Sequence, residues 1–330
     1  MLIVSNNDKL WPVGKKRLKN IHSISDIKML YAKCGEYINC NLLKEGNIFM
    51  KKTVVDSEIL PVRFEIKILY VSSLIIALMV AIVSIIGVLY QKSLYPTENL
   101  LHSFVPNDIV NLVVGLPLLL ISIWLTRRGK LIGLLCWPGA IFYMLYVYFP
   151  FIICVPFNIL FLPYLILFSL SIYTLIGIIV SIDGNAVSNH LSDIIPAKVS
   201  GGILIGLSVL IVLRQSGLIA NALINKTLID PQELALWIDD FSIASPAMFI
   251  GGFFLWKKKP LGYVVGAGLF ITYVFLSLGL IPFLAIQSHL KNTSIDLLAI
   301  VILIIMAVIC FIPFLFFVRG ASKMSNLQKK

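Results

Sequence analysis

Residues 131–149 read LIGLLCWPGAIFYMLYVYF, an apolar run that contains no charged side chain. A helix that crosses the hydrocarbon core of a membrane needs roughly 17–25 such residues. The rest of the chain is similar, because 59% of its 330 residues are aliphatic, aromatic or cysteine and only 13% are charged. A soluble domain of this composition would lack the polar side chains to cover its surface. The sequence therefore predicts an all-α, polytopic transmembrane helix bundle.

Eight apolar runs are separated by short polar segments. Lipid offers the backbone no hydrogen-bond partners, so each run is expected to form a helix. Phe241–Trp256 is the shortest run, and a re-entrant or interfacial segment is the alternative for it. The expected spans are Leu69–Leu89, Ile109–Thr126, Leu131–Phe149, Phe157–Ile182, Gly201–Ala220, Phe241–Trp256, Leu261–Leu284 and Ile295–Phe317.

The last four runs resemble the first four. Residues 108–124, DIVNLVVGLPLLLISIW, and residues 240–256, DFSIASPAMFIGGFFLW, both begin with Asp and end with Trp. A basic turn and a run with two spaced glycines follow each stretch: Gly133 and Gly139, then Gly262 and Gly268. Four crossings in each half insert both halves the same way up. We therefore expect a 4+4 parallel internal repeat around a pseudo-two-fold axis along the membrane normal.

This pattern divides the chain into five parts. They are a cytoplasmic basic segment (1–60), a first four-helix membrane repeat (61–182), a cytoplasmic linker (183–197), a second four-helix repeat (198–318) and a cytoplasmic tail (319–330). The first part has two interpretations. Met50-Lys51-Lys52 is typical of the start of a prokaryotic membrane protein, which would make residues 1–49 a start-site artefact. The alternative is a basic arm that contacts anionic lipid.

Most of the 27 Lys and Arg residues fall on one side of this topology, together with both termini. Loops rich in Lys and Arg stay in the cytoplasm, so both termini are expected to be cytoplasmic and the protein to lie in the cell membrane. The net charge of +11 is then a consequence of topology. The expected partner is the lipid bilayer and not nucleic acid, which would need a basic soluble module.

Arg214 is the only formal charge deep inside an apolar run. An unpaired charge in lipid is costly, so it either snorkels to the headgroups or pairs with a carboxylate at its own depth. Four aspartates, Asp108, Asp239, Asp240 and Asp296, map to the outer ends of spans. We therefore expect a candidate outer-face ionic cluster of Arg214, Asp108, Asp239 and Asp240. Helix N-capping is the alternative for Asp108 and Asp240, because each begins an apolar run.

Polar side chains also share helix faces within two neighbouring runs. Tyr143 and Tyr146 lie on one face of the third run, and Ser169 and Tyr173 lie on one face of the fourth. Tyrosine hydroxyls in a bilayer need hydrogen-bond partners. These four residues form a candidate polar cavity, unless the two helices simply bond to each other.

Two pairs of glycines and the connection before the sixth run lead to further predictions about helix packing and the membrane surface. The two Gly-x-x-x-Gly pairs, Gly202 with Gly206 and Gly262 with Gly266, are typical of close helix packing or of a homodimer seam. Residues 231–237 of the outer connection could form an amphipathic helix that lies on the membrane surface.

Sequence motifs for catalysis, cofactors or metal ions are missing. The chain has no His-Glu-x-x-His pair, no phosphate-binding loop and no Gly-x-Ser-x-Gly elbow. Cys34 and Cys40 have no histidine at ligand spacing, and no pair of cysteines falls on the outer side of the membrane. We therefore predict no catalytic residue, cofactor, metal site or structural disulfide.

The stretch from Trp124 to Leu162 contains the motifs WLTRRG (124–129), WPGA (137–140) and PFN (156–158). It resembles a run in uncharacterised prokaryotic multi-pass membrane proteins, over about residues 108–177. The resemblance implies membrane location, and it carries no activity or catalytic residue to this chain.

Three functions remain open from the sequence. A transporter or permease-like protein is favoured by the duplication, the prolines within spans and the candidate cavity. The scarcity of charge inside the runs favours an uncharged or weakly polar cargo. The second function is a non-transporting membrane subunit, assembly factor or sensor, with a homodimer or membrane complex as its setting. The third is an intramembrane enzyme that acts on lipid.

Overall fold

The structure is a computed structural model that describes residues 60–327 of the chain. The expectations for residues 1–49, for Cys34 and Cys40 and for the last three residues lie outside the described residues.

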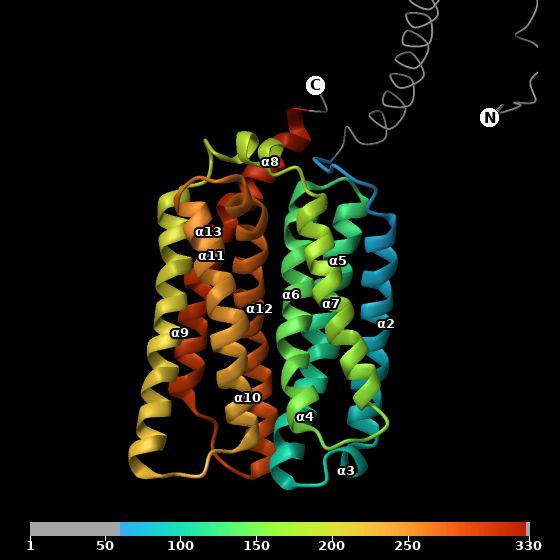
Figure 1. Cartoon of the computed structure of the whole chain (residues 1–330), viewed down its shortest axis with the longest axis vertical. Helices are drawn as coiled ribbons and strands as arrows, with labels where there is room; N and C mark the ends of the chain where they lie inside the picture. The colour runs from blue at the N-terminus through green and yellow to red at the C-terminus, as the bar shows by residue number, and fades with distance from the viewer. Residues whose placement is uncertain (1–59, 328–330) are drawn as a thin grey trace, which may run out of the picture. The chain divides into compact units, whose positions relative to one another are not determined.

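Within residues 60–327, eight helices are long and apolar enough to cross a membrane, which supports a multi-pass membrane protein. They stand side by side and nearly parallel (Figure 1). Six elements are single helices: α2 (Lys67–Leu89), α6 (Leu131–Cys154), α7 (Phe161–Ser181), α9 (Ala197–Asn225), α12 (Pro260–Lys291) and α13 (Leu297–Leu327). The second span joins α4 (Glu98–Val110), η2 (Asn111–Gly115) and α5 (Leu116–Arg127), and the sixth joins α10 (Pro231–Asp239), η3 (Asp240–Ala244) and α11 (Ser245–Trp256).

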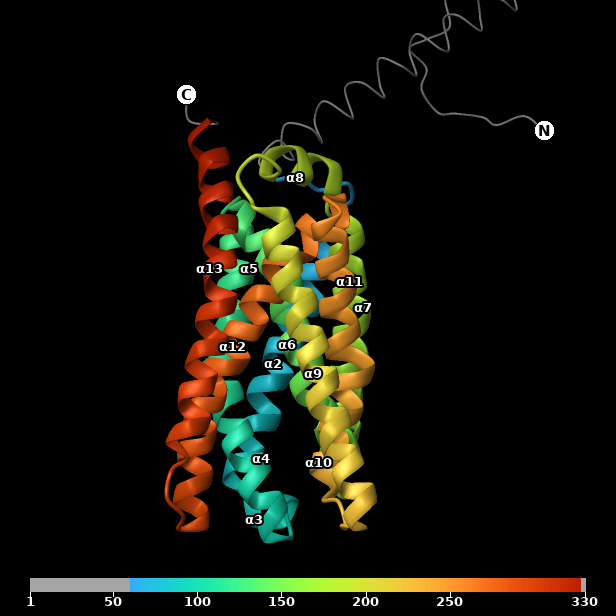
Figure 2. The ribbon, with the colours of Figure 1, turned by 90° about the vertical axis from the view of Figure 1, so that its left-hand side faces the viewer.

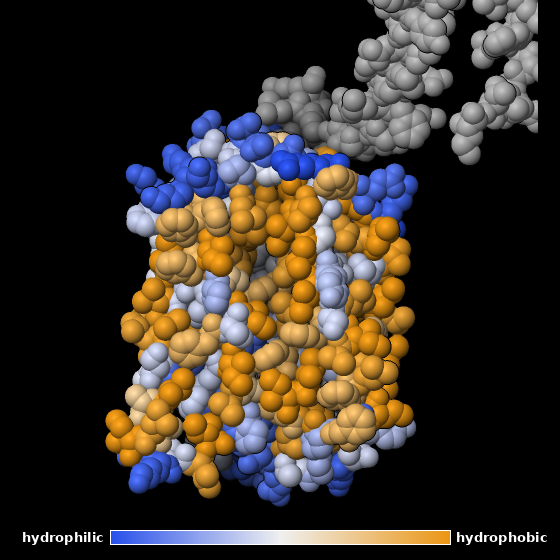
Figure 3. Space-filling model, in the orientation of Figure 1, coloured by the Kyte–Doolittle hydropathy of each residue, from blue (hydrophilic) through white to orange (hydrophobic). Residues whose placement is uncertain are grey.

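Two short helices, α3 (Gln91–Leu94) and α8 (Gly184–Leu191), lie at opposite ends of the bundle (Figure 1). The end with α8 also holds the turns after α5 and α11, with residues 127–130 and 257–259. We call it the basic end. Hydrophilic side chains gather at both ends of the bundle, and an apolar belt lies between them (Figure 3). This distribution is the one that a lipid bilayer stabilises, because charged groups stay at the headgroups and apolar groups in the hydrocarbon.

The second and sixth spans begin well before the apolar runs that predicted them. The side chain of Thr97 accepts a hydrogen bond from the backbone of Leu100 at 3.3 Å, and that of Asp230 accepts one from Gln232 at 3.0 Å. These residues are the N-caps. Asp108 and Asp240 therefore lie in helix interiors, and the N-cap interpretation of both residues is wrong.

The same observation corrects two other expectations. Residues 231–239 form α10, which runs through η3 into α11 as one span of 26 residues. The sixth span is therefore a full-length helix rather than a re-entrant segment, and residues 231–237 form its first turns rather than a separate helix on the surface. Residues 98–108 and 231–240 are polar enough to interrupt the apolar pattern. They are tolerated because much of their surface packs against other helices.

Both interrupted spans contain a π-helical turn, and both turns end just before a proline. Pro117 is the second residue of α5 and Pro246 is the second residue of α11. A proline ring clashes with the carbonyl four residues earlier and lacks the N–H that would bond to it. A wider turn relieves this clash and leaves backbone carbonyls without their usual partners. Such turns are often found at functional sites.

The described spans form two halves, residues 67–181 and residues 197–327, which lie next to each other with α6 and α12 in the middle (Figure 1). In Figure 2 the molecule is seen from the side of α9, so the second half lies in front of the first. In the first half α6 packs against α5 and α7, and in the second α12 packs against α11 and α13. Gly133 sits against the backbone of Leu125 and Thr126, and Gly262 sits in the same way against the backbone of Phe254 and Leu255.

These contacts correct the comparison based on the Asp-to-Trp spacing. The glycines and the π-helical turns of the two halves correspond at one constant spacing in the sequence. With that spacing, Trp124 corresponds to Phe253 rather than to Trp256, and Asn111 rather than Asp108 corresponds to Asp240. The equal distance between Asp and Trp in the two stretches does not mark equivalent positions.

The two Gly-x-x-x-Gly pairs have different surroundings. A Cβ atom on Gly262 or Gly266 would meet neighbouring helices, so this pair packs within the chain. A Cβ atom on Gly202 or Gly206 would meet nothing within 4 Å. Gly262 and Gly266 therefore serve helix packing within the chain. For Gly202 and Gly206 the homodimer seam stays a prediction.

Candidate functional site

A cavity of about 540 Å³ lies between the two halves, near the end opposite the basic end. Helices from both halves contribute to it: α4 and α6 from the first, and α9, α10 and α12 from the second. Its polar and charged lining residues are Ser103, Asn107, Tyr143, Tyr146, Arg214, Gln215, Asp230, Gln232, Glu233, Asp240 and Gln287. A hollow of this size, with polar and charged groups set in a largely apolar lining, is suited to holding a small molecule.

Asp240 is the first residue of the second π-helical turn and lines this cavity. The hydroxyl of Tyr146 on α6 donates a hydrogen bond to Asp240 Oδ1 at 3.1 Å. The side-chain amide of Gln215 on α9 donates to Asp240 Oδ2. The Asp240 carboxylate is therefore held from the first half by Tyr146 and from the second half by Gln215.

Arg214 precedes Gln215 on α9 and lines the same cavity. It lies close enough to act on the Asp240 carboxylate electrostatically. Its nitrogens do not come within 4 Å of a carboxylate oxygen in the described part of the chain. Its side chain is exposed, so the structure combines a cavity position with the reach toward water expected of a snorkelling arginine.

Negatively charged side chains outnumber positively charged ones in the cavity lining. Three carboxylates, those of Asp230, Glu233 and Asp240, face it together with the single guanidinium of Arg214. Asp230 also accepts a hydrogen bond at 3.2 Å from Asn99 of the first half, so it links the two halves near the cavity mouth. An excess of negative charge within a low-dielectric wall raises the local concentration of cations.

Asp239 lies directly behind this surface. Its side chain is 0% exposed, and neither of its carboxylate oxygens has a hydrogen-bond partner. The hydroxyl of Tyr273 is also buried without a partner, and Tyr273 lies near both Asp239 and Asp240. Buried carboxylates inside membrane spans are expensive and mark functional positions in membrane proteins.

The expected ionic cluster is thus partly assembled. Arg214 and Asp240 line the cavity, and Asp239 is buried next to Asp240. Asp108 is buried elsewhere, within the first half, where it accepts a hydrogen bond at 2.6 Å from the hydroxyl of Tyr95. It does not line the cavity.

Of the four residues expected to line one polar cavity, two line the cavity between the halves and two do not. Tyr143 and Tyr146 line the cavity between the halves. Ser169 and Tyr173 lie on α7, outside it, and the Tyr173 side chain is 74% exposed on the outer surface. The buried face of α7 instead carries Tyr164, Leu167, Ser171, Thr174 and Ile178, which follow the helical period on a different face.

Several cavity residues carry no sequence signal that would have singled them out. Gln215 and Gln287 are lone polar residues at helix positions, and Asp230 and Glu233 fall in a segment that reads as an outer loop. Asn111, which was not singled out either, is the first residue of a π-helical turn and is fully buried.

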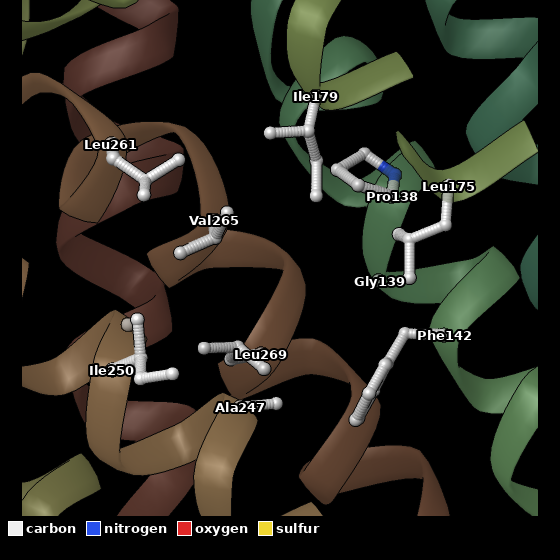
Figure 4. A pocket seen from close by; sticks show the side chains of 11 residues that line it. Pro138, Gly139, Phe142, Leu175, Ile179, Ala247, Ile250, Leu261, Val265 and Leu269 are labelled. Atoms are coloured by element: carbon white, nitrogen blue, oxygen red, sulfur yellow. The ribbon is translucent and has the colours of Figure 1, made fainter. Parts of the chain in front are cut away.

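A second, smaller pocket of about 280 Å³ lies between α6 and α7 on one side and α11 and α12 on the other (Figure 4). Figure 4 shows Pro138, Gly139, Phe142, Leu175 and Ile179 facing Ala247, Ile250, Leu261, Val265 and Leu269 across it. Its lining is apolar, so it is suited to hydrocarbon rather than to a polar ligand.

Comparison of the chain with protein-family models, with curated proteins and with solved structures finds no match. The class of protein is therefore defined by the fold and the site. It is an all-helical protein with eight helices, among the described residues, that are long and apolar enough to span a membrane, and with a polar cavity between two sets of four.

Proposed function

We propose that the chain is inserted in the cell membrane as a 4+4 parallel repeat, with the basic end and both termini in the cytoplasm. The density of Lys and Arg at the turns after α5 and α11 supports this orientation. The matching glycine contacts of the two halves support the repeat. In this orientation the cavity between the halves opens toward the outside of the cell.

We propose that the protein is permease-like and that this cavity binds its cargo. The observation that carries the proposal is the position of Asp240, in the cavity and bonded from both halves. A ligand that competes with Tyr146 for this carboxylate weakens a contact between the halves. Binding is then linked to a rocking motion of one half against the other, which is how parallel-repeat carriers expose a site alternately on two sides.

The charge of the lining changes the expected cargo. The sequence favoured an uncharged or weakly polar molecule because the spans lacked charge. The cavity instead offers three carboxylates, one guanidinium and the rings of Phe104, Tyr143 and Tyr146. Tyrosine and phenylalanine rings attract organic cations through their faces. A small amine or quaternary ammonium compound with an apolar body is the ligand class that this lining supports best.

Benzyltrimethylammonium is a suitable probe because it combines a permanent cation with one ring. Its binding to the purified full chain in detergent is measured by calorimetry for the wild type and for Asp240→Asn. We expect the dissociation constant to rise at least tenfold in the variant, roughly the effect of removing one charge partner. Asp183→Asn, which changes a carboxylate at the basic end, is the matched control and should bind as the wild type does.

Flux then separates binding from transport. In proteoliposomes, the wild type should move the labelled probe across the membrane, and Asp240→Asn should not. Binding without flux would favour a non-transporting sensor, whereas equal binding by the wild type and Asp240→Asn would remove the cavity as the ligand site.

A further inference from the structure

Asp108 lies in a buried cluster of polar side chains in the first half, and this cluster does not line the cargo cavity. The cluster consists of Asp108, Asn111, Ser84, Tyr95, Tyr148 and Tyr164, and we refer to it as the Asp108 pocket. A Cβ atom on Gly87 of α2 would lie 2.7 Å from Asp108 Cγ and 2.9 Å from the Tyr95 hydroxyl. Glycine at this position is therefore required for the carboxylate to sit against α2.

Several polar atoms of this pocket have no hydrogen-bond partner. Tyr95 donates to Asp108 Oδ2 at 2.6 Å, but Asp108 Oδ1 has no partner. Both amide atoms of Asn111 and the hydroxyl of Tyr164 are also without partners. Asp108 and Asn111 are both 0% exposed. Because buried polar groups are nearly always satisfied, so many unpaired atoms in one pocket indicate a bound partner.

The unpaired atoms lie close together. Asn111 follows Asp108 by three residues, so their side chains share one face of the helix. Ser84 on α2 lies near Asp108, and its hydroxyl forms a 2.9 Å hydrogen bond with the hydroxyl of Tyr148 on α6. Tyr148 in turn lies near Asn111. Side-chain oxygens of Ser84, Asn111 and Tyr148 therefore lie near the Asp108 carboxylate.

No cationic side chain balances this carboxylate. Within residues 60–327 no Lys, Arg or His nitrogen lies within 4 Å of it. The groups that face it are Ser84 and Gly87 from α2, Tyr95 from the preceding loop, Tyr148 from α6 and Tyr164 from α7. An uncompensated charge in such a site costs several kcal/mol, so the pocket requires a positive charge from outside the chain.

We propose that the Asp108 pocket binds one monovalent hard cation, sodium in particular, through Asp108 Oδ1, Asn111 Oδ1 and the neighbouring hydroxyl oxygens. One carboxylate neutralises one positive charge, whereas calcium sites use several carboxylates. A proton on Asp108 would satisfy Oδ1 and leave Asn111 unpaired. Asn111 also opens the first π-helical turn, and backbone carbonyls released by irregular helix are sodium ligands in carriers.

The test uses the purified full chain in detergent. Binding of radioactive sodium is measured by a scintillation proximity assay, and thermal stability is compared in sodium chloride and in N-methylglucamine chloride at equal ionic strength. We expect saturable binding and a sodium-dependent rise in Tm for the wild type. Asp108→Asn should weaken sodium binding at least tenfold and remove the rise in Tm.

Two milder variants keep the test decisive if Asp108→Asn does not fold. Ser84→Ala and Asn111→Ala each remove one neutral oxygen and should weaken sodium binding several-fold. Asp183→Asn is the matched control, because it removes a carboxylate outside the pocket and should retain the sodium response. This outcome does not depend on the identity of the cargo or on whether the cavity binds it.

Three results would overturn the proposal. The first is the lack of saturable sodium binding by the wild type. The second is unchanged sodium binding by Asp108→Asn. The third is a proton released by the wild type but not by Asp108→Asn during a pH titration, at a Tm independent of sodium, which would make Asp108 a proton site.

Discussion

Gly139 of α6 and Gly268 of α12 lie against each other where the two halves meet. A Cβ atom on Gly268 would be 2.9 Å from the backbone nitrogen of Gly139, and one on Gly139 would contact the carbonyl of Gly268. The hydroxyl of Thr272 donates at 2.8 Å to the carbonyl oxygens of both glycines. The two residues occupy corresponding positions in their halves, so the proposed pseudo-two-fold axis passes close to this contact.

Substitution of Gly268 by leucine should therefore separate the halves. The new side chain would meet backbone atoms, which cannot move aside as a side chain does, so we expect a loss of more than about 3 kcal/mol, above the usual range for overpacking. Unfolding in detergent measures it. Gly217→Leu is the matched control, because nothing lies within 4 Å of its Cβ, and a comparable loss there would contradict the packing described.

Trp137 donates a hydrogen bond from its indole nitrogen to the Ser73 hydroxyl at 2.9 Å, and both side chains are buried. Ser73→Ala leaves the indole N–H without a partner, which should cost about 1–3 kcal/mol. In a Trp137→Phe background the same change should cost much less, because the donor is already missing. Equal costs in the two backgrounds would show that the bond contributes nothing.

Tyr146 joins the halves through its bond to Asp240. Tyr146→Phe removes that donor from a partly buried carboxylate, and we expect a loss of about 1–3 kcal/mol in unfolding free energy. Tyr173→Phe removes a hydroxyl of the same kind from an exposed side chain and should change stability by less than about 0.5 kcal/mol. If the two variants lose the same stability, the bond between the halves is not a stabilising contact.

Asp183 links the segment before α2 to α8 at the basic end. Its carboxylate accepts a 3.0 Å hydrogen bond from Arg63 and caps α8. The hydrogen bond from Arg63 lowers the pKa of Asp183 below its usual range. The stabilisation is therefore complete above the unfolded pKa of about 4 and is lost as the pH falls through the lower folded value.

The pair is largely exposed, so solvent limits its contribution to at most about 1 kcal/mol. Asp183→Asn should keep the cap and lose the pH dependence, whereas Asp183→Ala should lose both. Unfolding free energies measured in detergent between about pH 3 and 7 test this. An Asp183→Asn variant with an unchanged pH profile would contradict it.

The sequence was sufficient to predict eight helices because lipid requires long apolar runs. It failed where polar residues continue a helix. Glu98 to Asp108 and Pro231 to Asp240 belong to the second and sixth spans, but their polarity resembles that of loops. One side of each segment packs against other helices or lines the cavity, as Asp108 and Asp239 are buried and Asn107 and Asp240 line it. Hydropathy records composition and cannot record which neighbour covers a residue, so the spans were predicted too short.

The candidate site was limited by the same problem. Tyr143, Tyr146, Arg214 and Asp240 were all singled out, because tyrosine stripes and charges within apolar runs are visible in a sequence. Their grouping was not visible. Asp108 and Asp240 begin similar stretches, yet Asn111 rather than Asp108 corresponds to Asp240, because each of these two residues opens a π-helical turn. The matching distance from Asp to Trp in the two stretches concealed this correspondence.

Access of water to the cavity from the outer side is the most direct test of the account. In a background without cysteine, Leu276→Cys lies in the cavity, while Leu278→Cys lies at nearly the same depth on α12 with its side chain 43% exposed on the outer surface. We predict that a membrane-impermeant thiol reagent labels Leu276→Cys in intact cells and leaves Leu278→Cys unlabelled. Resistance of Leu276→Cys to the reagent from both sides of the membrane would contradict the account.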